Sequence, residues 1–141
     1  MEKQPSKYCT CLYHSANALS RVMTKMANEE FASAGLGASY AFLLMTVNEK
    51  QGIQPKEISQ QMQLTPSTVT RLIEKMEYRG YLMRKSNGRM TEVYSTKSGM
   101  ALQPTLKKAW ASLYSRYSDL LGQDMGNKLT TSIFEATQKL E

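Results

Sequence analysis

The stretch that decides the fold runs from Leu64 to Leu82 and reads LTPSTVTRLIEKMEYRGYL. Thr65 can cap a helix with its hydroxyl, and Pro66 suits the first helical position because its missing N–H is not needed there. Gly80 supplies a left-handed residue that can end the helix. The stretch therefore predicts one helix that begins at Pro66 and ends before Gly80.

The two faces of this helix differ in chemistry. The apolar residues fall at helical spacing and should pack inward; they are Val69, Leu72, Ile73 and Met76. The residues left outside are Ser67, Thr68, Thr70, Arg71 and Lys75. A small, hydroxylated and basic face can enter the major groove of double-stranded DNA, where Arg reads guanine and small residues allow close approach. We expect Arg71 and Thr70 to be the leading base or phosphate contacts; alternatively, Arg71 pairs with Glu74 or Glu77 along its own helix.

Helix and turn signals surround this segment. Pro55 opens a short helix before it, and residues 63–65 make the turn between the two helices. After Gly80, residues 81–84 and 91–95 read as two strands, and Asn87-Gly88 between them is a hairpin signal. This order predicts a winged helix-turn-helix over about residues 39–97, in a mainly α protein with a small β-hairpin wing.

Long amphipathic helices are predicted at both ends of the chain. They cover about residues 6–31 and 98–140, with a break at Gly122 and a kink or delayed start at Pro104. Tyr8 and Leu12 begin the apolar stripe of the first helix. These helices have more apolar surface than one small domain can cover. We therefore expect a homodimer that places two recognition helices about one DNA turn, ~34 Å, apart.

Length and charge agree with this organisation. The 141 residues are enough for a single domain spanning residues 1–141. Between Arg71 and Lys97 there are seven basic and three acidic residues, so this segment holds four of the chain's six excess positive charges. A basic patch in one structural unit indicates a polyanionic partner, although a solvated charged face would look the same.

No membrane or secretion signal is apparent in the sequence. The most apolar run, Tyr40 to Met45, is far shorter than the ~20 residues that a membrane span needs. The first seven residues lack an apolar stretch leading to a cleavage site. We expect a cytoplasmic protein with no membrane partner.

The chain resembles the MarR family of bacterial transcriptional regulators over essentially its whole length. The resemblance rests on residues 67–73 (STVTRLI), 76–82 (MEYRGYL) and 96–99 (TKSG), together with Arg84 and Arg89. It implies a homodimer that binds a palindromic promoter site, usually as a repressor. It also implies that a small-molecule effector or an oxidant weakens that binding.

The wing shows one departure from the family pattern. Arg89 stands seven residues before Thr96, as in the family, where this Arg projects into the minor groove. The family usually has an Asp two residues before that Arg, whereas this chain has Asn87, so the orienting ion pair is missing. We still expect Lys85 and Arg89 to contact phosphate or the minor groove.

A Cys-rich segment near the N-terminus suggests a redox function. Peroxide-sensing members of the MarR family have a reactive Cys near the start of the first helix, held by Tyr side chains. Cys9 lies one helical turn before Tyr13, and Tyr40 begins the second helix, so this chain is similar. A Tyr hydroxyl that donates to sulfur would favour the reactive thiolate. Alternatively, Cys9 and Cys11 are small hydrophobic residues at a dimer interface.

No metal site or cofactor is expected. Cys11 and His14 share a helical face, but tetrahedral zinc needs two more ligands and nothing in the sequence supplies them.

A ligand pocket is harder to place from sequence. The resemblance puts it between the dimer helices and the winged unit. The residues that could line it are Tyr13, Asn17, Tyr40, Trp110 and Tyr114. The same aromatic spacing is also typical of a core.

Two other classes of function fit the sequence less well. An enzyme is not expected, because one His, two Asp and no glycine-rich phosphate loop leave little to assemble a catalytic site. A winged helix used for protein contact without specific DNA binding would need an apolar or acidic outward face. The face after Pro66 is polar and basic, which favours a DNA-binding regulator.

Overall fold

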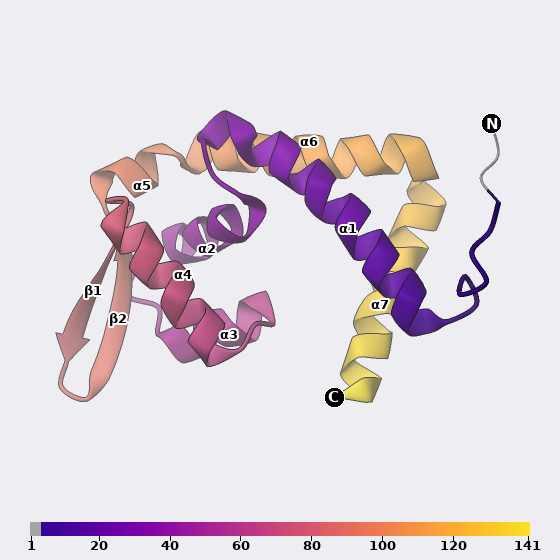
Figure 1. The fold of residues 1–141 in the computed structure, drawn as a ribbon. Coiled ribbons are helices and arrows are strands. Elements are labelled where there is room, and N and C mark those ends of the chain that lie inside the picture. Colours follow the sequence, from indigo (N-terminus) through magenta and orange to yellow (C-terminus); the bar gives the residue numbers. More distant parts are fainter. Residues whose placement is uncertain (1–3) are drawn as a thin grey trace.

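The computed structural model describes residues 4–141, which form a mainly helical chain with one two-stranded hairpin (Figure 1). In chain order the elements are α1 Leu12–Phe31, the 3-10 turn η1 Ala32–Ala34, α2 Ala38–Glu49, α3 Pro55–Met62, α4 Pro66–Tyr78, β1 Leu82–Asn87, β2 Met90–Ser95, α5 Lys97–Ala101, α6 Gln103–Leu121 and α7 Gln123–Leu140. Figure 1 shows α2, α3, α4 and the hairpin gathered on one side, with α1 and α6 extending away from them and α7 returning from the far end of α6. The predicted fold class is confirmed.

The helix after Thr65 forms as predicted. The Thr65 hydroxyl accepts a hydrogen bond from the Thr68 backbone N–H at 3.4 Å, and Pro66 occupies the first turn. Gly80 has φ +83°, a left-handed backbone that suits glycine after the last helical turn. Val69, Ile73 and Met76 are buried, and Leu72 packs half-buried against the same core.

The wing is longer than predicted. The two strands pair antiparallel from Leu82 opposite Ser95 to Asn87 opposite Met90, which leaves Gly88 and Arg89 as the two turn residues. Gly88 adopts φ +66°, so the tight turn lets pairing continue to the tip. The first predicted strand ended three residues too early and the second began one residue too late, because polar residues near the turn do not mark the end of a strand.

The first helix begins at Leu12, six residues later than predicted. Residues 6–11 form two successive turns, in which the Cys9 N–H donates to the Ser6 carbonyl and the Cys11 N–H donates to the Tyr8 carbonyl, at 3.0 and 2.9 Å. Cys11 has an extended backbone (φ −93°, ψ 120°) and provides no side-chain cap. Tyr, Cys and Thr are weak helix formers, so this run does not extend the helix. Cys9 therefore does not lie one helical turn before Tyr13, and Tyr8 is not part of the helical stripe.

The C-terminal breaks lie where they were expected. Pro104 stands in the first turn of α6, so the helix that Thr96 caps is interrupted and α6 begins at Gln103. Gly122, at φ +84°, separates α6 from α7. Within residues 4–141, no single helix is both long and apolar enough to cross a membrane, although α1–η1 and α2 pass that test as a pair bent by 60°.

The core joins the winged unit to the long helices. Its fully buried side chains come from α1, α2, α3, α4, β2 and α6, and include Phe31, Leu44, Ile58, Ile73, Val93 and Leu106. A second group of apolar side chains remains exposed along the long helices. These are Leu12, Tyr13, Val22, Trp110, Tyr114, Leu120, Leu121, Met125, Ile133, Phe134 and Leu140.

Candidate nucleic-acid interface and cavity

The outward face of α4 combines hydroxyls with free cations. Ser67, Thr70, Arg71 and Lys75 are exposed, while Thr68 is half-buried. The Thr68 hydroxyl lies 2.9 Å from that of Thr65. The structure thus brings all five predicted residues onto one accessible surface.

Arg71 keeps its charge available. Its Nη2 donates to the Thr68 hydroxyl at 3.4 Å, and within residues 4–141 it makes no ion pair. Glu77 instead pairs with Arg84 of β1 at 2.8 Å. The alternative in which Arg71 is held by Glu74 or Glu77 is therefore not seen.

The wing carries its cations on exposed strand and turn positions. The Lys85 Nζ lies 5.0 Å from the centre of the Tyr94 ring, a cation–π contact that orients the ammonium group. Arg89 is exposed at the turn, beside Asn87. Lys85 and Arg89 therefore stand on the wing, separate from the α4 cations.

The sequence pattern does not predict the groove that lies beside α4. It has a volume of about 580 Å³ and is lined by Tyr40, Arg71, Glu74, Lys75, Tyr78 and Arg79. Tyr78 is 94% exposed, and Arg79 donates to the Gly35 carbonyl at 3.0 Å. The sequence signal for this groove is Tyr78, a large aromatic residue at the end of α4 that is not one of the apolar residues on its buried face.

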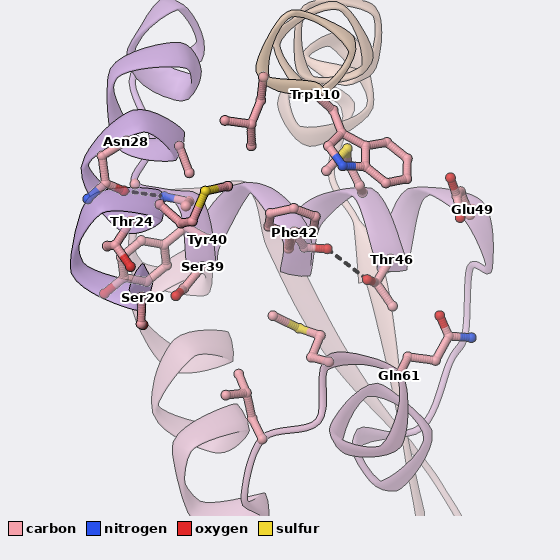
Figure 2. Close-up of a pocket in the computed structure, with 18 residues that line it drawn as sticks. Ser20, Thr24, Asn28, Ser39, Tyr40, Phe42, Thr46, Glu49, Gln61 and Trp110 are labelled. Atoms are coloured by element: carbon pink, nitrogen blue, oxygen red, sulfur yellow. Dashed lines mark hydrogen bonds between the residues drawn. The ribbon is translucent and has the colours of Figure 1, made fainter. Parts of the chain in front are cut away.

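A larger cavity of about 870 Å³ lies between α1, α2, α3 and α6 (Figure 2). Tyr40 and Trp110 line it, as do Phe42, Met45 and Met62. Trp110 meets Phe42 edge to face, with ring centroids 6.0 Å apart. The cavity therefore has an aromatic and methionine-rich wall.

Polar groups stand at both ends of this cavity. Figure 2 shows Ser20, Thr24, Asn28 and Ser39 around one end, and Gln61 and Glu49 at the other. Asn28 Oδ1 accepts from the Ala38 backbone N–H at 2.9 Å and so ties α1 to the start of α2. The lining residues that the sequence does not predict come mostly from α1 and α2. Those of α1 look like ordinary polar surface residues, and those of α2 look like ordinary core residues.

Three of the five predicted pocket residues lie outside this lining. Tyr13 is 79% exposed near the start of α1, and Asn17 donates to the Tyr13 carbonyl one turn earlier. Tyr114 packs edge to face on Tyr117, at 5.5 Å between centroids, and its hydroxyl donates to Asn127 at 3.4 Å. Burial, and then the neighbouring Tyr114, raises the pKa of the Tyr117 hydroxyl.

Cys9 and Cys11 are free and exposed in the turns before α1. The Cys9 carbonyl accepts from the Ser15 hydroxyl at 3.1 Å. Tyr40 lines the cavity beside Ser20, which lies two turns or more along α1 from these thiols. Within one chain, Tyr40 and Cys9 therefore do not lie together. In residues 4–141, no group of three or more His, Cys, Asp and Glu side chains could hold a metal ion.

This arrangement defines a winged helix-turn-helix protein. The MarR family model matches residues 38–88. The HTH-type transcriptional regulator SarZ of Staphylococcus haemolyticus is 27% identical over 94 residues, which cover 64% of this chain and 63% of the relative. The HTH-type transcriptional regulator PapX of Escherichia coli is 29% identical over 109 residues, covering 66% of each chain. The chain thus spans just under two thirds of the length of these relatives.

Solved structures match over nearly the whole chain. The transcriptional repressor CouR bound to a 23-mer DNA duplex has a TM-score of 0.83 at 18% identity, covering 97% of this chain and 99% of that one. The PcaV regulator of Streptomyces coelicolor, in complex with its natural ligand, has a TM-score of 0.83 at 15% identity, covering 99% and 100%. The winged unit of this chain therefore matches the MarR family of winged helix-turn-helix transcriptional regulators. Both of the curated relatives, SarZ and PapX, are described as transcriptional regulators.

Proposed function

We propose that this protein is a transcriptional regulator that binds double-stranded DNA sequence-specifically as a homodimer. The observation that carries the proposal is the exposed α4 face, where Arg71 and Lys75 are free of ion pairs within residues 4–141 beside the hydroxyls of Ser67, Thr68 and Thr70. Such a face combines base-reading and phosphate-binding groups on one helix. CouR, whose fold is shared, is named as a repressor bound to DNA, which supports repression as the mode.

The wing extends this surface. Lys85 and Arg89 would contact phosphate or the minor groove beside the segment that α4 reads. Asn87 replaces an acid that could orient Arg89, so Arg89 would act as a mobile cation. Palindromic operator DNA is the expected partner, since a two-fold dimer presents two identical recognition helices.

The exposed apolar side chains of the long helices support the homodimer. Leu120 is 75% exposed and Phe134 is 51% exposed, and both belong to a set spread over α1, α6 and α7. Surfaces of this kind mark protein–protein contacts. We place Tyr13, Asn17 and Tyr114 at this dimer-facing surface, and assign residues 6–31 and 98–140 to dimerisation and residues 39–97 to DNA binding within a single domain spanning residues 1–141.

Two inputs could relieve DNA binding. The cavity lined by Tyr40 and Trp110 has the size of a small-molecule effector site, and PcaV carries its natural ligand on the same fold. The alternative input is oxidation at Cys9, which its exposure favours. Cys9 and Cys11 precede a helix of the proposed dimer surface, so an oxidised thiol could alter subunit packing.

The test is binding of the purified protein to the region upstream of its own gene, compared with random duplex across a salt series. Preferential binding that weakens steeply as salt rises would support a sequence-reading regulator. Equal weak binding would show that this region holds no specific site and would send the search to other promoters. Absence of binding at low salt would instead favour a winged helix used for protein contact.

A further inference from the structure

The charge of the cavity indicates what it binds. Among the described residues of its lining, Glu49 is the one with a full charge, and no Lys, Arg or His side chain lines the space. Tyr40, Phe42 and Trp110 supply aromatic surface, and Met23, Met45 and Met62 supply polarisable thioethers. We propose that the cavity takes a lipophilic organic cation, with its ammonium group at the Glu49 and Trp110 end.

Glu49 is free to receive a cation. It forms no ion pair within residues 4–141. Lys50 is held by Glu57 at 2.7 Å, and Lys107, one turn before Trp110 on α6, is exposed and does not pair with Glu49. An exposed carboxylate beside a cavity attracts a ligand ammonium group through its negative charge.

The dipole of α2 adds to the negative charge at the Glu49 end of the cavity. The helix runs along the cavity from Gly37 to Glu49, both of which line it, over about 18 Å. Its C-terminal end carries partial negative charge from unpaired carbonyls, so the helix dipole and the Glu49 carboxylate have the same sign at that end. A cation placed there is attracted by both.

The aromatic wall supplies the second attraction. Figure 2 shows Trp110 and Glu49 at the same end of the cavity, with Phe42 and Thr46 between that end and Tyr40. Indole rings bind alkylammonium groups over their faces, most strongly when water is excluded. A phenyl or alkyl body would then lie along α2 against Phe42 and Met45.

An anionic ligand fits this space poorly. Burying a carboxylate costs free energy unless a cation or several donors compensate it. Thr46 already donates to the Phe42 carbonyl at 2.7 Å, and the Ala38 N–H at the start of α2 is already bonded to Asn28. The remaining hydroxyl and amide groups around Asn28 and Ser39 suit a neutral polar group at the far end of a cationic ligand.

This inference rests on the proposed effector function, but its test does not need DNA. Trp110 is the single Trp of the chain and lies in the lining, so its fluorescence reports occupancy. Three probes of matched length would be titrated into the full chain: phenylbutyl-trimethylammonium, phenylpentanoate and phenylpentanol. Calorimetry on the same samples detects binding that leaves the fluorescence unchanged.

We expect saturable binding of the ammonium probe and at least tenfold weaker binding of phenylpentanoate. Glu49→Gln should weaken binding of the ammonium probe about tenfold and leave phenylpentanol binding unchanged. Glu135→Gln removes the same charge at an exposed α7 position outside the cavity and should change neither. Circular dichroism would show that each variant is folded.

Equal or tighter binding of phenylpentanoate would overturn the assignment, as would unchanged affinity for the ammonium probe in Glu49→Gln or no binding of any probe. These results would not bear on the proposed DNA-binding function, because DNA affinity is measured in a separate experiment. Ammonium binding without an effect on DNA affinity would support the ligand class and contradict the effector role.

Discussion

Asn48 donates a hydrogen bond from Nδ2 to Oε1 of Gln103 at 2.7 Å, which joins α2 to the first turn of α6. The same amide donates to the Gly99 carbonyl at 3.2 Å, and Asn48 Oδ1 accepts from the Ser95 hydroxyl at the end of the wing. One half-buried side chain thus ties together α2, the base of the wing and the start of the long C-terminal helices. This connection links the proposed DNA-binding unit to the proposed dimerisation helices.

Asn48→Ala should lower the free energy of unfolding by about 1–3 kcal/mol, because it leaves the Ser95 hydroxyl without its acceptor and Gln103 Oε1 without its donor. Urea denaturation at fixed protein concentration would measure the loss. Asn87→Ala is the control, since Asn87 is exposed at the tip of the wing and forms no side-chain hydrogen bond within residues 4–141. An Asn48→Ala variant as stable as the control would show that these bonds contribute nothing net.

Gly99→Ala should be more damaging than its helical position suggests. A Cβ at Gly99 would lie 2.3 Å from the Tyr81 carbonyl oxygen and 3.2 Å from Leu44 Cδ1, so α5 must shift away from the base of the wing. We expect a loss of about 1–3 kcal/mol in thermal or urea unfolding.

Gly126→Ala provides the opposite expectation. Apart from the two chain neighbours and the backbone of its own helix, no heavy atom of residues 4–141 lies within 4 Å of the added Cβ, and the residue is inside α7. Replacing a helical glycine without strain should stabilise the fold by about 0.5–1 kcal/mol. If both glycine variants changed stability in the same direction, the contact at Tyr81 would not be the cause.

The elements of the winged unit could be predicted because local signals and packing agree there. Thr65, Pro66 and Gly80 bound α4, and the spacing of its apolar residues matches the face that the core buries. The start of α1 could not be read in the same way. Residues 6–11 satisfy their backbone groups by short-range turns, and no capping residue distinguishes these turns from a helix.

The cavity was predictable only in part. Tyr40 and Trp110 stand out in the sequence as large aromatics on adjacent helices, but Glu49 and Asn28 look like ordinary surface residues. Their roles depend on how α1, α2 and α6 cross, which is a tertiary property. Tyr13, Asn17 and Tyr114 share the helical spacing of pocket residues yet lie outside the lining.

Arg71→Ala should weaken binding to a cognate site by about 1–3 kcal/mol and weaken binding to random duplex less. The reason is that a base contact contributes only where the matching base is present. Titration of both duplexes at one salt concentration would measure the difference, with Arg21→Ala on α1 as the matched loss of a guanidinium. Equal losses on both duplexes would leave Arg71 as a phosphate contact alone.

Arg89→Ala should behave differently from Arg71→Ala. A cation at the wing turn that contacts phosphate acts on any sequence, so affinity should fall similarly for cognate and random DNA. The slope of log affinity against log salt should also become shallower by about one unit. An unchanged slope would indicate that Arg89 does not neutralise a phosphate.

Cys9 distinguishes the two proposed inputs. If an oxidant relieves DNA binding through this exposed thiol, organic peroxide should weaken binding of the unmodified protein, and Cys9→Ser should keep its DNA affinity in the same assay. Cys11→Ser is the matched control, because Cys11 is equally free and lies two residues away. The backbone from Cys9 to Cys11 is not helical, so the two thiols are less constrained than they would be on a helix. Mass spectrometry of the peroxide-treated chain would show whether they form a disulfide. Release of DNA that persists in Cys9→Ser would rule out this thiol as the sensor and leave the cavity as the proposed input.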